Sequence, residues 1–150
     1  MEDNRLKPGL DYFSQKGWSP FPFQIQAWTD YLDGKSGLLN APTGSGKTYA
    51  LWFGILLNYI QNNPTDWRTP RKNGLQVIWV TPLRALAQDL QKAMQEACEE
   101  LGLPWTVAVR NGDTDAKTRA RFQRNPPECL ITTPETLHIL LSQKETAALY

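Results

Sequence analysis

The sequence predicts an α/β fold with a parallel sheet flanked by helices, on three observations. Short apolar runs alternate along the chain with longer segments of helical periodicity. A glycine-rich loop follows the first apolar run and opens a long apolar segment. Two later runs are followed by Thr-Pro, and proline is well placed at the first position of a helix. Alternation of this kind is typical of parallel sheets joined by crossover helices.

Four short apolar runs are the expected strands, at residues 36–41, 75–80, 105–109 and 128–132. The run 75–80 shows little alternation, which predicts a strand buried on both faces. Residues 47–61 are apolar almost all round, which predicts a buried helix.

The remaining segments predict one loop and three helices between or after these strands. Residues 62–74 combine prolines, a glycine and basic residues, which is typical of a surface loop. A helix is expected at 114–124, with Asp113 or Thr114 as its N-cap, and another begins near Pro134. A long amphipathic helix ends at the natural cap Gly102 and carries one apolar stripe, formed by Leu83, Leu86, Ala87, Leu90, Ala93, Met94, Ala97 and Leu101.

Composition excludes several classes of protein. The chain has 150 residues, a length typical of one domain, and a formal net charge of +1. Hydrophobic residues make up 41% and charged residues 21%, so the chain is not disordered, collagen-like or a disulfide scaffold. The balanced charge also excludes a nucleic-acid binder held by bulk positive charge, although it leaves local basic patches open.

The cysteines and the N-terminus predict a soluble cytoplasmic protein. Cys98 and Cys129 are too far apart for a zinc motif, and we expect two small buried thiols in a reducing compartment. No signal peptide follows Met1. The most apolar stretch, residues 50–57, is far shorter than the roughly 20 residues of a membrane helix, so no membrane association is expected.

The glycine-rich loop matches the phosphate-binding pattern G-x-x-x-x-G-K-[ST], except that Ala41 stands at its first position. Glycines let successive N–H groups turn toward phosphate oxygens, and the following helix adds the positive end of its dipole. We expect Lys47, the candidate catalytic residue, to reach the β- and γ-phosphates of ATP, and the Thr48 hydroxyl to hold Mg²⁺. The expected ATP-binding residues of the loop are Thr43, Gly44, Ser45, Gly46, Lys47 and Thr48.

This variant of the loop resembles that of superfamily 2 helicases, and an upstream segment extends the resemblance. Residues 17–24 resemble the Q motif of DEAD-box proteins. A glutamine amide offers both a donor and an acceptor, so Gln24 can pair with the N6 and N7 edge of adenine. Trp18 is expected to stack on the base, although its spacing differs from the DEAD-box form by one residue. Gln26 remains an alternative to Gln24.

Two segments that follow expected strands resemble nucleic-acid-binding motifs. The first, Thr81, Pro82, Leu83 and Arg84, resembles motif Ia, and Arg84 in a first helical turn suits a phosphate. The second, Thr133, Pro134 and Glu135, resembles motif Ib, in which a threonine hydroxyl and a helix N-terminus hold the next phosphate. Open α/β sheets bind ligands at the carboxyl ends of their strands.

A further candidate lies between these two motifs. Gly112 and Asp113 form a turn after the third expected strand. The helix after them carries four basic residues, which suit either a single-stranded backbone track or a solvated helix surface. The four are Lys117, Arg119, Arg121 and Arg124.

Taken in order, the motifs resemble the Lhr-type DEXH-box DNA helicases, especially the ligase-associated bacterial branch. The resemblance covers nearly the whole chain from residue 17. It implies a RecA-like P-loop NTPase fold and ATP-driven 3′-to-5′ translocation on single-stranded DNA. It also implies a role in DNA repair, with repair proteins such as a ligase as partners.

One departure limits what the chain is expected to do. A P-loop ATPase needs an Asp-Glu pair at the end of a buried strand, and none of the expected strands ends that way. We therefore expect the N-terminal part of a first RecA-like domain, with a Q-motif region at 1–35 and a P-loop core at 36–150. We expect this part to lack the Mg²⁺-binding strand and to be completed by the C-terminal remainder of the helicase. By itself it is expected to hydrolyse no ATP.

Three alternatives stay open at this point. The chain could bind nucleotide or nucleic acid without turnover, either as a fragment or as a subunit completed by another chain. It could be an RNA-directed DEAD-box-like helicase, since no residue visibly reads a 2′-hydroxyl. A nucleotide kinase would need neither the Gln24 segment nor two Thr-Pro strand ends.

Overall fold

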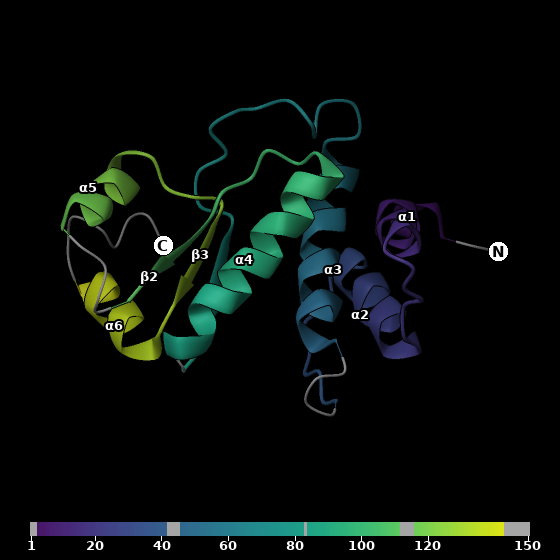
Figure 1. The fold of residues 1–150 in the computed structure, drawn as a ribbon, viewed down its shortest axis with the longest axis horizontal. Helices are drawn as coiled ribbons and strands as arrows, with labels where there is room; N and C mark the ends of the chain where they lie inside the picture. The colour runs from purple at the N-terminus through teal and green to yellow at the C-terminus, as the bar shows by residue number, and fades with distance from the viewer. Residues whose placement is uncertain (1–2, 42–45, 83, 112–115, 143–150) are drawn as a thin grey trace. The chain divides into compact units, whose positions relative to one another are not determined.

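The computed structural model describes residues 3–41, 46–82, 84–111 and 116–142, with the side chain of Arg84 left out. The chain divides into two compact units, which we call the first unit, Met1–Trp67, and the second unit, Arg68–Tyr150 (Figure 1). Within the described part of the chain, no helix has both the length and the apolar content needed to cross a bilayer.

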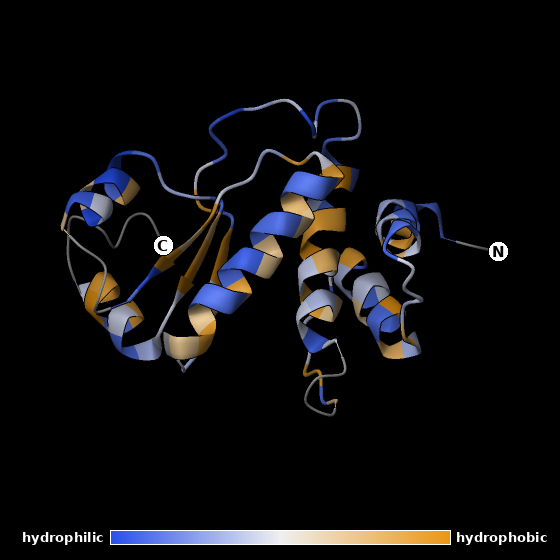
Figure 2. Cartoon of the chain, in the orientation of Figure 1, coloured by the Kyte–Doolittle hydropathy of each residue, from blue (hydrophilic) through white to orange (hydrophobic). Residues whose placement is uncertain are grey.

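The first unit is helical. A 3₁₀ turn at Asn4–Leu6 leads into α1 (Lys7–Gln15), followed by α2 (Pro22–Leu32) and α3 (Lys47–Asn62). Proline stands in the first turn of α1 and at the first position of α2, where its missing N–H costs nothing. The apolar residues of α3 appear as a run of orange along that helix (Figure 2). The expected buried helix is confirmed for most of its apolar residues, but Leu51 is 45% exposed.

An aromatic cluster forms the core of the first unit. The ring of Phe13 on α1 meets those of Trp28 and Phe53, on α2 and α3, at centroid distances of 5.3 and 5.5 Å in edge-to-face geometry. Trp28 is fully buried, and its indole N–H donates to the carbonyl oxygen of Tyr49 at 3.0 Å. Because buried aromatic rings contribute a large apolar area, they help to hold these three helices together.

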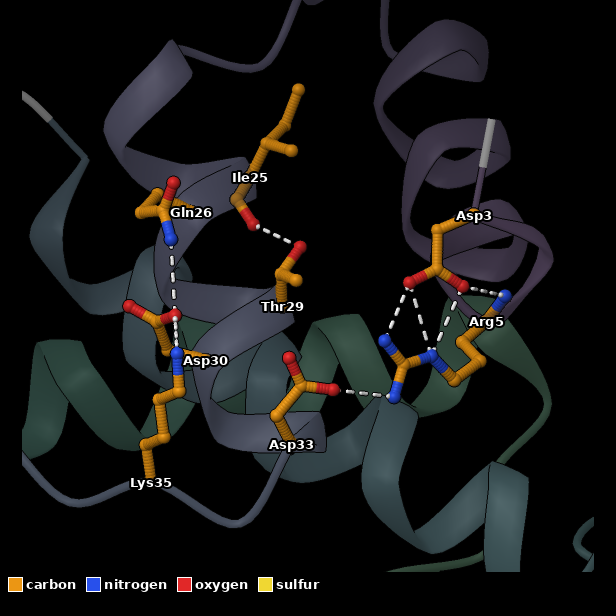
Figure 3. A network of polar contacts seen from close by, with 8 residues as sticks. All are labelled: Asp3, Arg5, Ile25, Gln26, Thr29, Asp30, Asp33 and Lys35. Carbon is orange, nitrogen blue, oxygen red and sulfur yellow. Dashed lines mark hydrogen bonds and ion pairs between the residues drawn. The ribbon is translucent and has the colours of Figure 1, made fainter. Parts of the chain in front are cut away.

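Surface ion pairs tie the start of the chain to α2 (Figure 3). The guanidinium of Arg5 donates to both carboxylate oxygens of Asp3 and, at 3.0 Å, to Asp33 after α2. These hydrogen bonds from Arg5 hold the pKa of Asp3 below its usual value. Lys35 pairs with Asp30 at 3.5 Å. All five side chains lie at the surface, where such pairs contribute little to stability.

The strand expected at 36–41 is wrong. These residues form no helix and no strand, and Leu38 is 95% exposed. A strand exists only when a neighbouring strand pairs with it, and the described sheet pairs only β1, β3 and β2.

The second unit contains a parallel three-stranded sheet in the order β1-β3-β2. Its strands are β1 (Val77–Val80), β2 (Val107–Arg110) and β3 (Cys129–Thr132), each shorter than or shifted from the expected range by one or two residues. The helices are α4 (Arg84–Leu101), α5 (Ala116–Arg124) and α6 (Pro134–Ser142). The α/β class with a parallel sheet flanked by helices is confirmed.

The two faces of the sheet carry different side chains. On one face, Phe122 of α5 and Leu140 of α6 pack with Leu130 of β3. On the other, α4 packs mainly against β2. The α4 stripe is confirmed for Ala87, Met94 and Ala97, which are buried, but Leu86 is 48% exposed. The blue and orange faces of α4 are visible in Figure 2.

β1 is an edge strand, so the expectation that residues 75–80 are buried on both faces is wrong. Its residues Val77 to Trp79 are only partly buried, and Val80 is 45% exposed. β3, in contrast, is buried along its whole length because it has a neighbour on each side. A continuous apolar run therefore did not distinguish an edge strand from a central one.

Candidate nucleotide and nucleic-acid sites

The described part of the phosphate loop lies at the start of α3. Gly46 is the N-cap and has φ +89°, a left-handed conformation that favours glycine. Lys47 and Thr48 are the first two helical residues, both half-buried, and the first turn contains no acidic residue. A lysine at the positive end of a helix dipole is electrostatically unfavourable without an anion nearby. These features fit the triphosphate of ATP.

Gln24 connects the Q-motif region to this loop. Its side chain is 3% exposed, and its amide Nε2 donates to the carbonyl oxygen of Gly46 at 3.0 Å. Its Oε1 accepts from the backbone N–H of Phe21 at 2.8 Å. The Nε2 of Gln24 has a second N–H to donate, and its Oε1 can accept a second hydrogen bond. Contact with a base would use this remaining donor and acceptor. Gln26, the alternative, is exposed and donates instead to Asp30 at 3.0 Å.

Trp18 lies close to the same loop. Its ring is 43% exposed and lies over Tyr49, with centroids 5.9 Å apart and planes 32° apart. The residue it contacts, Tyr49, directly follows Thr48, the expected Mg²⁺ ligand, in the sequence. Phe13 supports it from the core with an edge-to-face contact at 5.7 Å. A half-exposed ring of this kind can stack on a base.

The register of the sheet brings the nucleic-acid candidates to one edge. Val80, Thr132 and Arg110 are aligned across the three strands, so the residues after them emerge together at the carboxyl edge. Thr81 confirms this alignment, because its N–H donates to the carbonyl oxygen of Thr132 at 2.9 Å. Pro82 is exposed beside it.

Thr133 is the N-cap of α6. Its hydroxyl donates to the Thr136 hydroxyl at 3.0 Å and accepts from the Thr136 N–H at 3.4 Å. Thr133 is 1% exposed, whereas Pro134 and Glu135 in the first helical turn are exposed. The Thr133 hydroxyl therefore orders the helix start, and a phosphate would meet the backbone N–H groups of that turn.

Several expected site residues lie outside the described residues, and the structure brings no evidence on them. They are Thr43, Gly44, Ser45, Leu83, Gly112 and Asp113, together with the side chain of Arg84. Arg84 itself is the first residue of α4, as expected for motif Ia. The N-cap candidates Asp113 and Thr114 fall in the same undescribed range.

Two residues that were not among the expected site residues also lie at the carboxyl edge of the sheet. Arg110 ends β2 with only 5% of its surface exposed, beside Thr132 of β3. The Thr132 hydroxyl, 1% exposed, makes no hydrogen bond within the described residues. An arginine that closes an apolar strand directly before Asn-Gly was the signal available in the sequence.

The described residues hold no cluster of three or more His, Cys, Asp or Glu side chains placed to bind a metal ion. Cys98 and Cys129 are free and buried, which confirms the expectation of structural thiols. Burial raises the pKa of both thiols, to about 12 for Cys129.

Comparisons with known proteins agree with this geometry. Residues 21–149 match the family described as DEAD/DEAH box helicase. The chain is 36% identical over 142 residues to the Lhr helicase/probable uracil glycosylase of Mycolicibacterium smegmatis, and 32% identical over 145 residues to the Lhr helicase/uracil glycosylase of Escherichia coli. These matches cover 88% and 89% of this chain but 9% of each relative.

A solved structure shares the fold. The structure of Mycobacterium smegmatis helicase Lhr bound to ssDNA and AMP-PNP superposes with a TM-score of 0.71 at 34% identity. It covers 95% of this chain, which in turn spans 19% of that protein. The α/β arrangement with three parallel strands is thus that of a RecA-like helicase domain. The chain belongs to the DEAD/DEAH box helicase family and is similar to its Lhr-type members.

Proposed function

We propose that residues 1–150 form the N-terminal part of the first RecA-like ATP-binding domain of an ATP-dependent DNA helicase. The carrying observation is the hydrogen bond from the Gln24 amide to Gly46, the N-cap from which Lys47 and Thr48 begin α3. It joins the expected base-binding segment to the expected phosphate-binding segment. The Lhr relatives support the same assignment, because one of them is described bound to AMP-PNP.

For the nucleotide, each residue has a defined task. Thr43, Gly44, Ser45 and Gly46 would offer backbone N–H groups to the phosphates, and the Lys47 ammonium would neutralise the β- and γ-oxygens. Thr48 would supply one oxygen ligand to Mg²⁺. The metal, when bound, neutralises charge that develops on the transferred phosphoryl group. Trp18 would stack on adenine, and Gln24 would read its edge.

For nucleic acid, the carboxyl edge of the sheet supplies the track. Two helices, α4 and α6, start four and two residues after the aligned strand ends Val80 and Thr132, so the N-termini of both helices lie near that edge. The proposed contacts are Thr81, Pro82, Leu83, Arg84, Gly112, Asp113, Thr133, Pro134 and Glu135. Because such contacts are to phosphate, binding of single-stranded DNA should weaken as salt rises.

We further propose that these residues alone hydrolyse no appreciable ATP. The described strands end in Val80, Arg110 and Thr132, and none of them presents the Asp-Glu pair that a P-loop ATPase uses. Val80 on the free edge of β1, with Ile139 and Leu141 on α6, leaves apolar surface exposed. That surface suits the remainder of the helicase domain as a partner.

The biological setting belongs to the same proposal. Resemblance to ligase-associated Lhr-type helicases supports 3′-to-5′ translocation on single-stranded DNA during DNA repair, with repair proteins such as a ligase as partners. The two free, buried thiols suit the reducing cytoplasm.

The test is nucleotide and oligonucleotide binding to the 150-residue chain. Isothermal titration calorimetry with AMP-PNP and Mg²⁺ should show binding that Lys47→Ala weakens by about tenfold or more, because a charge-assisted phosphate contact contributes about 1.5–3 kcal/mol. Lys92→Ala, an exposed lysine within α4, is the matched control and should change nothing. Equal affinity of the Lys47→Ala and unsubstituted chains would refute the nucleotide site, and stronger binding to RNA than DNA would favour the RNA-directed alternative.

A further inference from the structure

A cavity of about 610 Å³ opens along the free edge of β2 in the second unit, away from every site residue assigned above. Its walls come from the loop before β1, from α4, from β2 and from α5. Its size lies within the usual range for ligand pockets, about 300–1,000 Å³. Four prolines and Phe122 form apolar parts of the wall; the prolines are Pro70, Pro104, Pro126 and Pro127.

Basic side chains converge on this cavity from distant parts of the sequence. Arg71 and Lys72 reach it from the loop before β1, and Arg121 reaches it from α5. The Arg121 guanidinium lies 5.7 Å from the Phe122 ring centroid, a cation–π contact beside the cavity wall. Convergence of cations around a cavity with an apolar wall indicates an anionic ligand.

One carboxylate also lines the cavity, and it is already engaged. Glu128 is 7% exposed and its Oε1 accepts from the Thr106 N–H at 2.9 Å. Its Oε2 accepts from the Asn73 amide at 3.1 Å. The lining residues therefore carry three positive charges against one buried negative charge whose oxygens already have donors.

A stripe of α5 extends the positive surface out of the cavity. Lys117, Arg121 and Arg124 stand at i, i+4 and i+7, so they lie on one face of the helix. All three are exposed, and none forms an ion pair with a carboxylate in the part of the chain the structure describes. Arg119, equally exposed, lies on the opposite side of the helix. Figure 2 shows blue residues along α5.

The stripe leads from the cavity toward the proposed nucleic-acid edge. α5 has nine residues, or about 13 Å of helix axis, and it starts a few residues after Arg110 at the carboxyl end of β2. It ends near Asn125, which lines the cavity. A flexible anionic chain that reaches the start of α5 could therefore continue along Lys117, Arg121 and Arg124 toward the cavity.

An acidic peptide added as a further strand to β2 fits this cavity less well. Such addition needs the outward backbone groups of the edge strand. The N–H and carbonyl of Val107 are already taken, by Gln95 Oε1 at 2.8 Å and by Gln91 Nε2 at 2.9 Å. Gln95 also donates to the carbonyl oxygen of Trp105 at 2.9 Å. Side chains of α4 thus occupy the outward backbone groups of Val107, whereas Lys72 and Arg121 bring positive charge to the cavity.

We propose that this groove, lined by Arg71, Lys72 and Arg121 and extended by Lys117 and Arg124, is a second site for the phosphodiester backbone of nucleic acid. It rests on the proposed function for the identity of the ligand, and it adds contacts beyond the motif residues. Phosphate contacts from Lys and Arg fix the path of a strand without reading its sequence. The groove would thus increase the length of nucleic-acid strand that the protein contacts.

The experiment measures fluorescence anisotropy of a labelled oligothymidylate of about 15 nucleotides, a length that spans one such binding surface. Arg121→Gln and Lys72→Gln should each weaken binding by about fivefold at low salt and reduce the salt slope by about 0.7, as expected for loss of one phosphate contact. Arg121→Lys should restore most of the affinity, because it keeps the charge. Arg119→Gln, with the same change of charge on the same helix, should stay within about 1.5-fold.

The outcomes separate this inference from the proposed function. If Arg84→Gln lowers the affinity for oligothymidylate and Arg121→Gln does not, the second site is overturned and the proposed site at the carboxyl edge of the sheet stands. If Arg121→Gln lowers the affinity and Arg84→Gln does not, the second site is supported and the site at the carboxyl edge is refuted. If Arg119→Gln and Arg121→Gln lower the affinity equally, the effect comes from net charge and not from the groove, and the proposal is overturned. Arg121-dependent binding of a labelled oligoglutamate peptide, when DNA binding is unaffected, also overturns it.

Circular dichroism melts check that the variants are folded. Arg121 is exposed and makes no ion pair within the described residues, so its replacement by Gln should leave the melting curve nearly unchanged. If a variant is unstable, chemical shifts of the unsubstituted ¹⁵N-labelled chain on addition of the oligothymidylate provide a second measurement. Shifts at Lys72, Phe122 and Asn125 support the groove, and their absence at saturating oligonucleotide overturns it.

Discussion

The side-chain amide of Gln24 donates a hydrogen bond of 3.0 Å to the carbonyl oxygen of Gly46, the residue directly before Lys47. The same amide accepts from the Phe21 N–H, so one buried side chain joins the start of α2 to the start of α3. A polar group buried in this way is stabilising only while its partners stay in place. Gln24 is therefore expected to position the phosphate loop whether or not a base is bound.

Replacing Gln24 by Ala should lower the free energy of unfolding by about 1–3 kcal/mol, because the Phe21 N–H and Gly46 carbonyl lose a partner. It should also weaken AMP-PNP binding. Thermal melts and calorimetry measure the two effects. Gln26→Ala is the control, since that side chain is exposed and bonded only to Asp30, and it should change stability by less than about 0.5 kcal/mol. Equal effects of the two substitutions would contradict the assignment.

Gly46→Ala should be more damaging than Gly34→Ala. Both glycines have positive φ, +89° and +80°, so either alanine meets a left-handed penalty of about 1–2 kcal/mol. A Cβ on Gly34 enters open space, whereas one on Gly46 collides with the amide nitrogen of Gln24. Chemical denaturation of both variants measures the difference. Indistinguishable stabilities would show that Gln24 does not constrain the loop.

Glu128→Ala should destabilise the second unit by about 2–3 kcal/mol, since hydrogen bonds to a buried carboxylate are among the stronger ones. The carboxylate ties the start of β2, through Thr106, to Asn73 in the loop before β1. Glu128→Gln keeps one acceptor and should lose about half as much. Denaturant melts provide the measurement, with the exposed Glu99→Ala as a control. If Glu128→Ala leaves the free energy of unfolding unchanged, water replaces these hydrogen bonds without loss of stability, which contradicts the prediction.

The buried thiols should make the chain less stable in alkali. Burial raises the pKa of Cys129 from 9.0 to about 12, and that of Cys98 also rises. Above pH 9 the unfolded thiols lose protons that the folded ones keep, so stability falls by roughly 1.4 kcal/mol per thiol per pH unit up to about pH 12. Comparison with the double variant Cys98→Ala, Cys129→Ala across this range isolates the effect. Parallel pH profiles of the two proteins would disprove it.

Much of the α/β pattern could be predicted because it is local. The long stripe of α4 and the Thr-Pro start of α6 depend on periodicity and capping, which neighbouring residues determine. The prediction of a strand at 36–41 was wrong because a strand needs a pairing partner, and the local sequence pattern does not identify that partner. For the same reason the apolar run that became β1 was expected to be buried, although its position at the edge leaves Val80 exposed.

The candidate site divides along the same line. The sequence by itself determined the residue types for phosphate binding, with Lys47 and Thr48 at the start of a helix, because that motif is contiguous. Only the tertiary structure decided that Gln24 contacts Gly46 across 22 positions, and that Lys72 and Arg121 line one cavity. Such contacts depend on how helices pack and strands align, and free energies of packing are not encoded in any short stretch of the chain.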